Sequence, residues 1–221
     1  MAISRIPLRK LLQLMYAPPA LRRSKLREDI RNDLARELGE QVGGPDFFSP
    51  FWKSAKNHVF GAGDLRDAIA AHIDVNYRRR RLYELLRDGF LTWWDRRRRW
   101  TNAPFTPANT LKGIYSNDGL GLIVKIDSLL SVTDGRGQDR HIYPYFSESP
   151  PLNDESARVG LWIMSEAFPN VPADQLRLLD IARGQNFSIA DHPFRGDEEA
   201  ILRARYVALV EERERLEDDY D

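Results

Sequence analysis

The sequence predicts an α/β protein with a helical amino-terminal region, a mixed-sheet core and a carboxy-terminal helix. Apolar residues recur at helical spacing through most of the first hundred residues. Between residues 111 and 146 the apolar runs become short, β-branched and aromatic, with Asn-Asp-Gly and Asp-Gly turns between them. Helical spacing returns near residue 153 and after residue 197. We therefore expect residues 1–104 to form a helical region that packs on a core made by residues 105–221, in one compact domain.

Several helices are predicted in the amino-terminal region. The first is amphipathic, and its apolar side is expected to carry Leu21, Leu26, Ile30, Leu34 and Leu38. Gly39 and the run Gly43-Gly44-Pro45 should end it. A short helix is expected at residues 51–59. Asp64 and Asn76 are each suited to cap a further helix, and the second of these should run past residue 90.

The core is predicted to contain three strands, a helix and one more strand. Residues 111–116 and 120–132 read as strands around a turn, and residues 140–146 as the third strand. A helix capped near Asn153 or Asp154 should follow. Residues 176–182 form the next expected strand, with a short extension at 187–190. The last helix should begin at about Asp197.

The composition excludes several classes of site. The chain of 221 residues has no cysteine, which excludes disulfides, thiolate zinc sites and cysteine nucleophiles. The four histidines, at positions 58, 72, 141 and 192, lack the close pairing of a metal site on one helix. No apolar run approaches the roughly 18 to 20 residues that cross a bilayer. We therefore expect a cytoplasmic protein with no membrane partner.

The charge is distributed unevenly, although the formal net charge is zero. Residues 76–100 hold nine arginines and three acidic residues, whereas residues 197–221 hold ten acidic residues and four arginines. A nucleic-acid-binding role is predicted for Arg78, Arg79, Arg80, Arg81, Arg96, Arg97, Arg98 and Arg99. Four consecutive arginines on a helix point about 100° apart, so each cluster cannot lie on one face. The alternative is a solvated or salt-bridged helix, paired in one version with the acidic carboxy-terminal helix.

Three tryptophans accompany the second arginine cluster. Trp93, Trp94 and Trp100 could stack on the bases of a single strand. They could equally belong to the core, where large aromatic side chains bury most surface.

One strand and the turn after it carry a family resemblance. The strand Gly121-Leu-Ile-Val-Lys-Ile-Asp127, followed by the turn at Asp134-Gly135, lies in a segment from about 111 to 190 that resembles the core of the PD-(D/E)XK nuclease superfamily, and within it the RecB-type exonucleases. The resemblance implies a helix, three strands, a helix and a strand (αβββαβ). It also implies that Asp127 stands at the metal-binding position of a Mg²⁺- or Mn²⁺-dependent site.

The sequence departs from that family where its chemistry requires a second carboxylate and a lysine. The strand His141-Ile-Tyr-Pro-Tyr-Phe146 offers Pro144 and Phe146 at those positions in one frame, and Tyr143 and Tyr145 in the other. The following helix has Arg158 and Trp162 in place of the Gln-x-x-x-Tyr pattern. A simpler interpretation of Asp127 is that it caps a turn or pairs with Lys125.

These observations favour a non-catalytic protein that associates with DNA or RNA or joins a complex, without a cofactor, on a degenerate nuclease-like fold. A metal-dependent nuclease with a rearranged site is the first alternative. It would use Asp127 as catalytic residue and metal ligand, with Lys125, Glu148 and Asp139 as further candidates. The second alternative is a subunit of a larger assembly whose acidic carboxy-terminal helix docks a basic protein partner.

Overall fold

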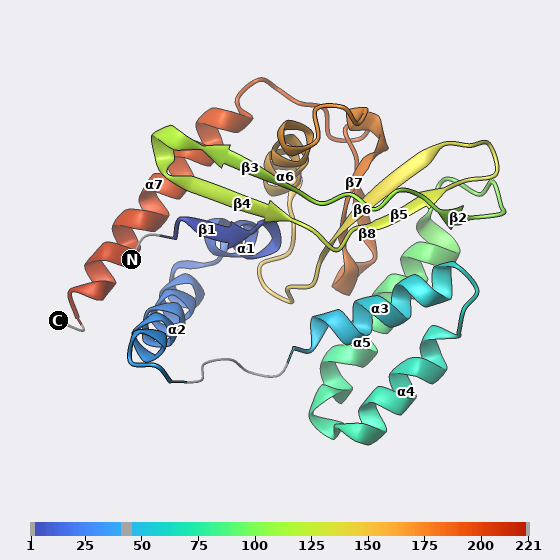
Figure 1. Ribbon diagram of the computed structural model, residues 1–221, viewed down its shortest axis with the longest axis horizontal. Coiled ribbons are helices and arrows are strands. Elements are labelled where there is room, and N and C mark those ends of the chain that lie inside the picture. The colour runs from blue at the N-terminus through green and yellow to red at the C-terminus, as the bar shows by residue number, and fades with distance from the viewer. Residues whose placement is uncertain (1–2, 41–45, 220–221) are drawn as a thin grey trace.

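The computed structural model describes residues 3–40 and 46–219. Within these ranges the chain forms helices α1 to α7 and two mixed sheets (Figure 1). The smaller sheet has the strand order β1-β4-β3. In it, β1 (Arg5–Pro7) runs parallel to β4 (Leu122–Ile126), and β3 (Gly113–Asn117) runs antiparallel to β4. The predicted α/β class is confirmed.

The larger sheet has the strand order β2-β5-β6-β7-β8. Its strands are β2 (Thr106–Pro107), β5 (Leu130–Thr133), β6 (Asp139–Tyr145), β7 (Leu176–Asp180) and β8 (Gln185–Phe187). The chain leaves β6 through helix α6 (Asp154–Ala167) and returns as β7, which is parallel to β6. The other neighbours are antiparallel. The predicted order of strands, a helix and a strand is present, but β3, β4, β5 and β6 precede the helix in place of three strands, and they are divided between two sheets.

The prediction of a single strand over residues 120–132 is wrong. β4 ends at Ile126 and β5 begins at Leu130, and Ser128 between them has a left-handed backbone with a φ of 63°. The indole Nε1 of Trp52 donates a hydrogen bond to the Ser128 carbonyl at 2.5 Å. This break lets the two halves of an otherwise continuous apolar segment join different sheets.

The amino-terminal region begins with a strand, which the sequence did not predict. β1 pairs with β4 and is followed by α1 (Leu8–Tyr16) and α2 (Pro19–Glu37). The residues at the end of the predicted apolar side of α2 are exposed, with Leu34 at 41% and Leu38 at 78%. Only the middle of α2 packs on the core, through Leu26 and Ile30. Gly43, Gly44 and Pro45 lie outside the described residues.

The next three helices are α3 (Phe48–Val59), α4 (Leu65–Val75) and α5 (Arg80–Thr92). Asp64 caps α4 as predicted, because its side chain accepts a hydrogen bond from the Arg66 backbone N–H at 2.7 Å. Asn76 accepts one from the Arg78 backbone N–H at 3.1 Å, but it heads a short 3₁₀ turn before α5 begins. Asn153 caps α6 with a capping box, as predicted.

The large sheet separates two apolar layers. Successive residues of a strand point to opposite faces. Tyr143 and Leu178 therefore pack with α1 and α6, while Ile142 and Leu179 pack with the aromatic side chains of α3 and α5. Figure 1 shows α3, α4 and α5 grouped at one end of the molecule, and α2 and α7 (Glu198–Glu217) at the other. None of the helices described is long and apolar enough to span a membrane.

Candidate functional site

The residues around Asp127 do not form a catalytic constellation. Asp127 follows β4 directly and is half-buried, as is Lys125 on the same face of the strand. Glu148 forms an ion pair with Arg81 at 2.6 Å, and Asp139 accepts a hydrogen bond from the Thr133 hydroxyl at 2.6 Å. Across residues 3–40 and 46–219, no group of three or more His, Asp or Glu side chains is placed to hold a metal ion.

Tyr143 and Tyr145, which the sequence comparison set against a nuclease carboxylate and lysine, lie on β6, in the other sheet from the strand that Asp127 follows. Burial raises the pKa of both Tyr143 and Tyr145 to about 12. The Tyr143 hydroxyl accepts a hydrogen bond from the Arg9 backbone N–H at 3.1 Å, and the Tyr145 hydroxyl donates one to the Pro150 carbonyl at 2.8 Å. Both side chains are core residues that remain neutral at physiological pH.

Each of the four histidines has a local partner. His58 accepts a hydrogen bond from a backbone N–H, His72 and His141 contact serine hydroxyls, and His192 lies 3.4 Å from Asp154. These are structural contacts within the core or at the surface, as expected for histidines that are not metal ligands.

The first arginine cluster is largely engaged within the protein. The Arg79 guanidinium lies over the rings of Phe47 and Tyr83, at 5.6 and 5.5 Å from their centroids. Arg80 forms an i,i+4 ion pair with Glu84 at 3.1 Å. With Arg81 held by Glu148, Arg78 is the member of this cluster that is exposed and makes no ion pair within the described chain. This part of α5 behaves as a salt-bridged helix.

The second arginine cluster follows a local change in helix geometry. After α5, residues Trp93–Arg97 form a π-helical turn that the Arg98 N–H closes by donating to the Trp93 carbonyl at 2.8 Å. Such wider turns recur at functional sites. Trp93 and Trp94 are buried, which confirms that they belong to the core. Trp100 is half-buried and packs edge-on against both.

Beside this turn lies a cleft of about 550 Å³, which we call the arginine cleft. One wall is the stretch from Trp93 to Trp100. The other walls are β7, β8 and the segment after β8. The cleft is lined by Trp93, Arg97, Arg98, Arg99, Trp100, Arg177, Gly184, Gln185, Asn186, Ser188, Ala190, Asp191 and His192. It therefore gathers four arginines, of which three belong to the predicted binding residues.

Arg98 carries its charge into an aromatic environment and forms no ion pair in the described chain, although the charge of Asp95 acts on it. Its guanidinium lies 3.7 Å from the ring centroid of Trp94 and 4.3 Å from that of Phe105. Burial lowers the pKa of Arg98, and its Nε and Nη1 atoms are buried without hydrogen-bond partners in the described structure. Cation–π contacts offset part of this cost, but they leave two donors unsatisfied.

Arg177 reaches the cleft from β7. Its register neighbour on β6 is Ile142, so its side chain shares the sheet face that packs against α5. Burial and the nearby positive charge of Arg140 together lower the pKa of Arg177 to about 10, against the opposing effect of Asp174 and Asp191. The guanidinium donates to the backbone carbonyls of Asp174 and Leu176, which satisfies donors without neutralising the charge.

The acidic side chain in the cleft is already used. Asp191 forms an ion pair with Arg99 at 2.6 Å and accepts a hydrogen bond from Ser188 at 3.1 Å. Arg97 donates to the carbonyls of Arg183 and Gly184. Within the described parts of the chain, Arg97, Arg98 and Arg177 form no ion pair with a carboxylate. The cleft lining thus carries more positive than negative charge, which Asp95, Asp174 and Asp191 offset in part.

Two neutral groups in the cleft wall also lack partners. The indole Nε1 of Trp93 is a buried donor, and the side-chain oxygen of Asn186 is a buried acceptor. Both atoms lack a hydrogen bond in the described structure. Neither atom is accessible to a molecule in the cleft, although both residues line it.

The acidic carboxy-terminal helix does not neutralise the arginine clusters. α7 packs on α1, α2 and α6, at the other end of the molecule from α5 (Figure 1). Glu212 pairs with Arg22, and Asp219 pairs with Arg27 at 3.4 Å. The interpretation that this helix pairs with the arginine clusters is wrong.

Sequence reasoning placed Arg97, Arg98 and Arg99 in a binding surface but missed the other side of the cleft. Arg177 had a usable signal, because it stands between Leu176 and Leu178 in a predicted strand and must point to the opposite face. Asn186 and Asp191 gave no signal, since only the tertiary fold brings them to the π-helical turn. Comparison with models of known protein families and with curated proteins finds no match to this chain.

Proposed function

We propose that this chain is a non-catalytic protein that associates with nucleic acid, and that the arginine cleft contacts its phosphate groups. The observation that carries the proposal is that Arg97, Arg98 and Arg177 line one cleft and form no ion pair with a carboxylate in the described structure. A desolvated cation is costly unless an anion joins it. Guanidiniums match phosphate oxygens in geometry and charge, which favours phosphate as that anion.

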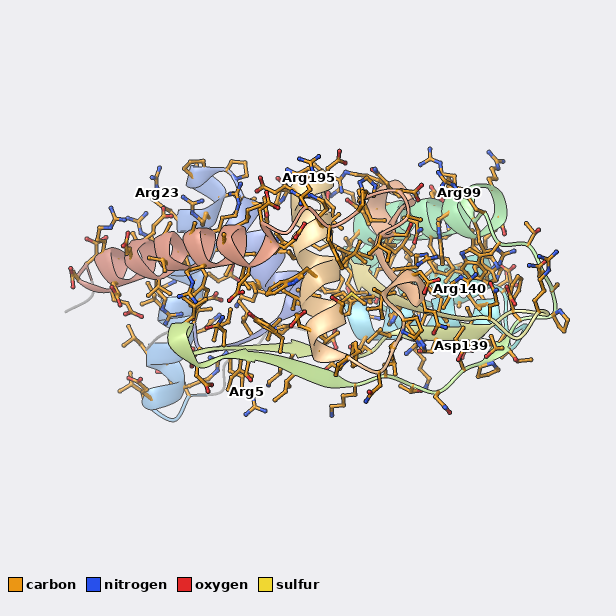
Figure 2. All side chains as sticks on the ribbon, turned by 90° about the horizontal axis from the view of Figure 1, so that it is seen from above. Arg5, Arg23, Arg99, Asp139, Arg140 and Arg195 are labelled. Carbon is orange, nitrogen blue, oxygen red and sulfur yellow. The ribbon has the colours of Figure 1, made fainter. Side chains whose placement is uncertain are left out.

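The surroundings of the cleft support a nucleic acid over a small anion alone. Arg96 is exposed next to the cleft and makes no ion pair in the described structure, and Arg99 is 80% exposed. Figure 2 shows Arg99 and Arg140 at the same end of the molecule, far from Arg23. A basic surface around a cationic cleft attracts an extended polyanion.

The proposal retains the nuclease-like core without the nuclease chemistry. The resemblance to the PD-(D/E)XK core remains part of the proposal, although β4 and β6 lie in different sheets. The neutral phenols of Tyr143 and Tyr145 support the absence of cleavage. The proposal includes a cytoplasmic location and no cofactor.

Binding is tested with end-labelled single- and double-stranded DNA and RNA, by fluorescence anisotropy at about 50 and 200 mM salt. We expect binding that weakens steeply with salt, as phosphate contacts require. The double variant R97Q/R99Q should lose roughly tenfold or more in affinity. Its matched control is Arg23→Gln at the far end of the molecule, which should bind like the wild type. Absence of binding to every nucleic acid at low salt would refute the proposal.

The same assay separates binding from cleavage when it is repeated with Mg²⁺ or Mn²⁺. We expect intact substrate with wild-type protein and unchanged affinity in Asp127→Ala, because Asp127 lies outside the arginine cleft. Metal-dependent cleavage that disappears in Asp127→Ala would replace the proposal with the nuclease alternative.

A further inference from the structure

The arginine cleft has the size and the groups to hold a single nucleotide. We infer that it binds a nucleoside phosphate monoester, which is either a free mononucleotide or the phosphorylated end of a strand. This inference rests on the proposed function, because it names the ligand of the same cleft. The chemistry of the two sources is the same, and only the experiment separates them.

The arginines line one cleft and do not form a track. A strand that runs across a surface needs cations spread along its path, since its phosphates follow one another. Arg97 and Arg98 come from the end of the π-helical turn and Arg177 from β7, and all three face one cavity. Its volume of about 550 Å³ falls within the range typical of small-molecule sites, roughly 300 to 1,000 Å³.

The charge of the cleft suits a monoester better than a diester. Four arginines and one carboxylate, that of Asp191, line the cavity, and Arg97 and Arg177 form no ion pair within the described residues. A phosphate monoester carries about −1.5 to −2 charges at neutral pH, whereas an internal diester carries a single negative charge. The terminal phosphate therefore neutralises more of the positive charge, and its additional free oxygen accepts a further hydrogen bond.

The neutral side chains in the cleft wall fit a ligand that carries more than phosphate. Gln185 and Asn186 line the cavity with amide side chains, which exchange hydrogen bonds with hydroxyl and amino groups such as those of a nucleoside. Trp100 gives the same cavity an aromatic wall. A nucleoside monophosphate thus fits both the neutral and the charged part of the lining.

The test compares single-stranded DNA of one sequence with a 5′-phosphate, a 3′-phosphate or hydroxyl ends, each labelled internally. Unlabelled AMP, adenosine and inorganic phosphate serve as competitors. We expect a phosphorylated end to bind roughly tenfold or more tightly than hydroxyl ends. AMP should compete, and adenosine and inorganic phosphate should each compete at least roughly tenfold more weakly.

Variants assign the effect to the cleft. Arg177→Gln should abolish the preference for a phosphorylated end, and Asn186→Leu should reduce the advantage of AMP over inorganic phosphate. The matched control is Arg78→Gln, which removes an exposed arginine outside the cleft and should preserve both preferences. If thermal unfolding shows that Arg177→Gln does not fold, Arg97→Gln tests the same preference from the opposite wall.

The outcomes separate this inference from the function on which it rests. Equal affinity for phosphorylated and hydroxyl ends, with no competition by AMP, would overturn the inference and leave nucleic-acid binding intact. Loss of all binding would overturn both. Tight AMP binding without an end preference identifies a free mononucleotide as the ligand, and an end preference that exceeds AMP binding identifies a strand terminus.

Discussion

The guanidinium of Arg158 and the carboxylate of Glu198 form an ion pair in which 5% and 2% of the two side chains are exposed. Arg158 lies on α6, and Glu198 begins α7. Arg158 also reaches Asp197 at 2.9 Å, and Glu198 accepts hydrogen bonds from the backbone N–H groups of Arg195 and Gly196. The pair therefore fixes the start of the carboxy-terminal helix against the core.

We expect Arg158→Met to lower the free energy of unfolding by about 2 to 3 kcal/mol, because it leaves Glu198 buried without its cation. Chemical denaturation measures the change. Arg23→Met is the matched control, since Arg23 is exposed and forms no ion pair in the described chain, and it should change stability by less than about 0.5 kcal/mol. Equal effects of the two substitutions would show that the buried pair adds nothing to stability.

The position of Arg158 shows what a pattern can and cannot reveal. The sequence predicted α6 and its cap, because Asn153 and the apolar periodicity are local features. It did not predict the partner of Arg158, which lies forty residues away at the start of another helix. In the comparison with the nuclease family, Arg158 stands in place of the glutamine of the Gln-x-x-x-Tyr pattern. In the structure, Arg158 forms a buried ion pair.

Close contact between α5 and the segment after β7 gives a second prediction. A Cβ on Gly89 would lie 2.0 Å from the Ile181 carbonyl oxygen, which the backbone cannot accommodate without moving. We expect Gly89→Ala to destabilise the protein by about 3 kcal/mol in denaturant unfolding. Gly63→Ala is the control, because nothing lies within 4 Å of the corresponding Cβ. A loss below about 1 kcal/mol for Gly89→Ala would contradict this close packing.

The same contact explains why the cleft was only half predicted. Gly184 has a φ of 56°, and its added Cβ would lie 2.5 Å from the Gly89 carbonyl oxygen. Two glycines in separate segments thus let the chain before β8 approach α5 and close the cleft wall. The sequence predicted the strand at residues 176–182, but the contact between Gly184 and Gly89 depends on helix packing that no local pattern encodes. The arginines that follow α5 form a run in the sequence and could be predicted, whereas the residues of the opposite cleft wall form no such pattern.

The buried pair of His141 and Ser131 predicts a dependence of stability on pH. His141 is 3% exposed, and its Nδ1 lies 2.9 Å from the Ser131 hydroxyl. Burial lowers the pKa of His141 below its usual value, so the unfolded chain takes up a proton before the folded chain does. Stability should therefore be full above the unfolded pKa of 6.5 and fall as the pH drops below it.

Denaturant unfolding between about pH 5 and 8 checks this sign. His141→Gln, which keeps a hydrogen-bonding side chain but does not titrate, should show a shallower decline toward acid. Burial and the charge of Arg79 also lower the pKa of His72, so part of the decline should persist in the variant. An identical slope in wild type and His141→Gln would show that His141 does not contribute.

Arg177 links stability to binding in opposite directions. Its charge is desolvated beside Arg140, and the pKa of Arg177 falls to about 10 for these two reasons. An arginine whose role is packing alone should raise the free energy of unfolding of the protein without ligand. An arginine whose role is ligand binding should lower that free energy until an anion is bound. We expect Arg177→Gln to raise the free energy of unfolding by about 0.5 to 1 kcal/mol without ligand.

The same variant should lose the stabilisation that AMP gives to the wild type. Thermal unfolding with and without AMP measures both effects, with Arg78→Gln as the control that should show neither. Arg177→Gln could instead destabilise the protein without ligand, while AMP still stabilises the variant. That result would show that Arg177 stabilises the fold and that its charge does not contribute to AMP binding.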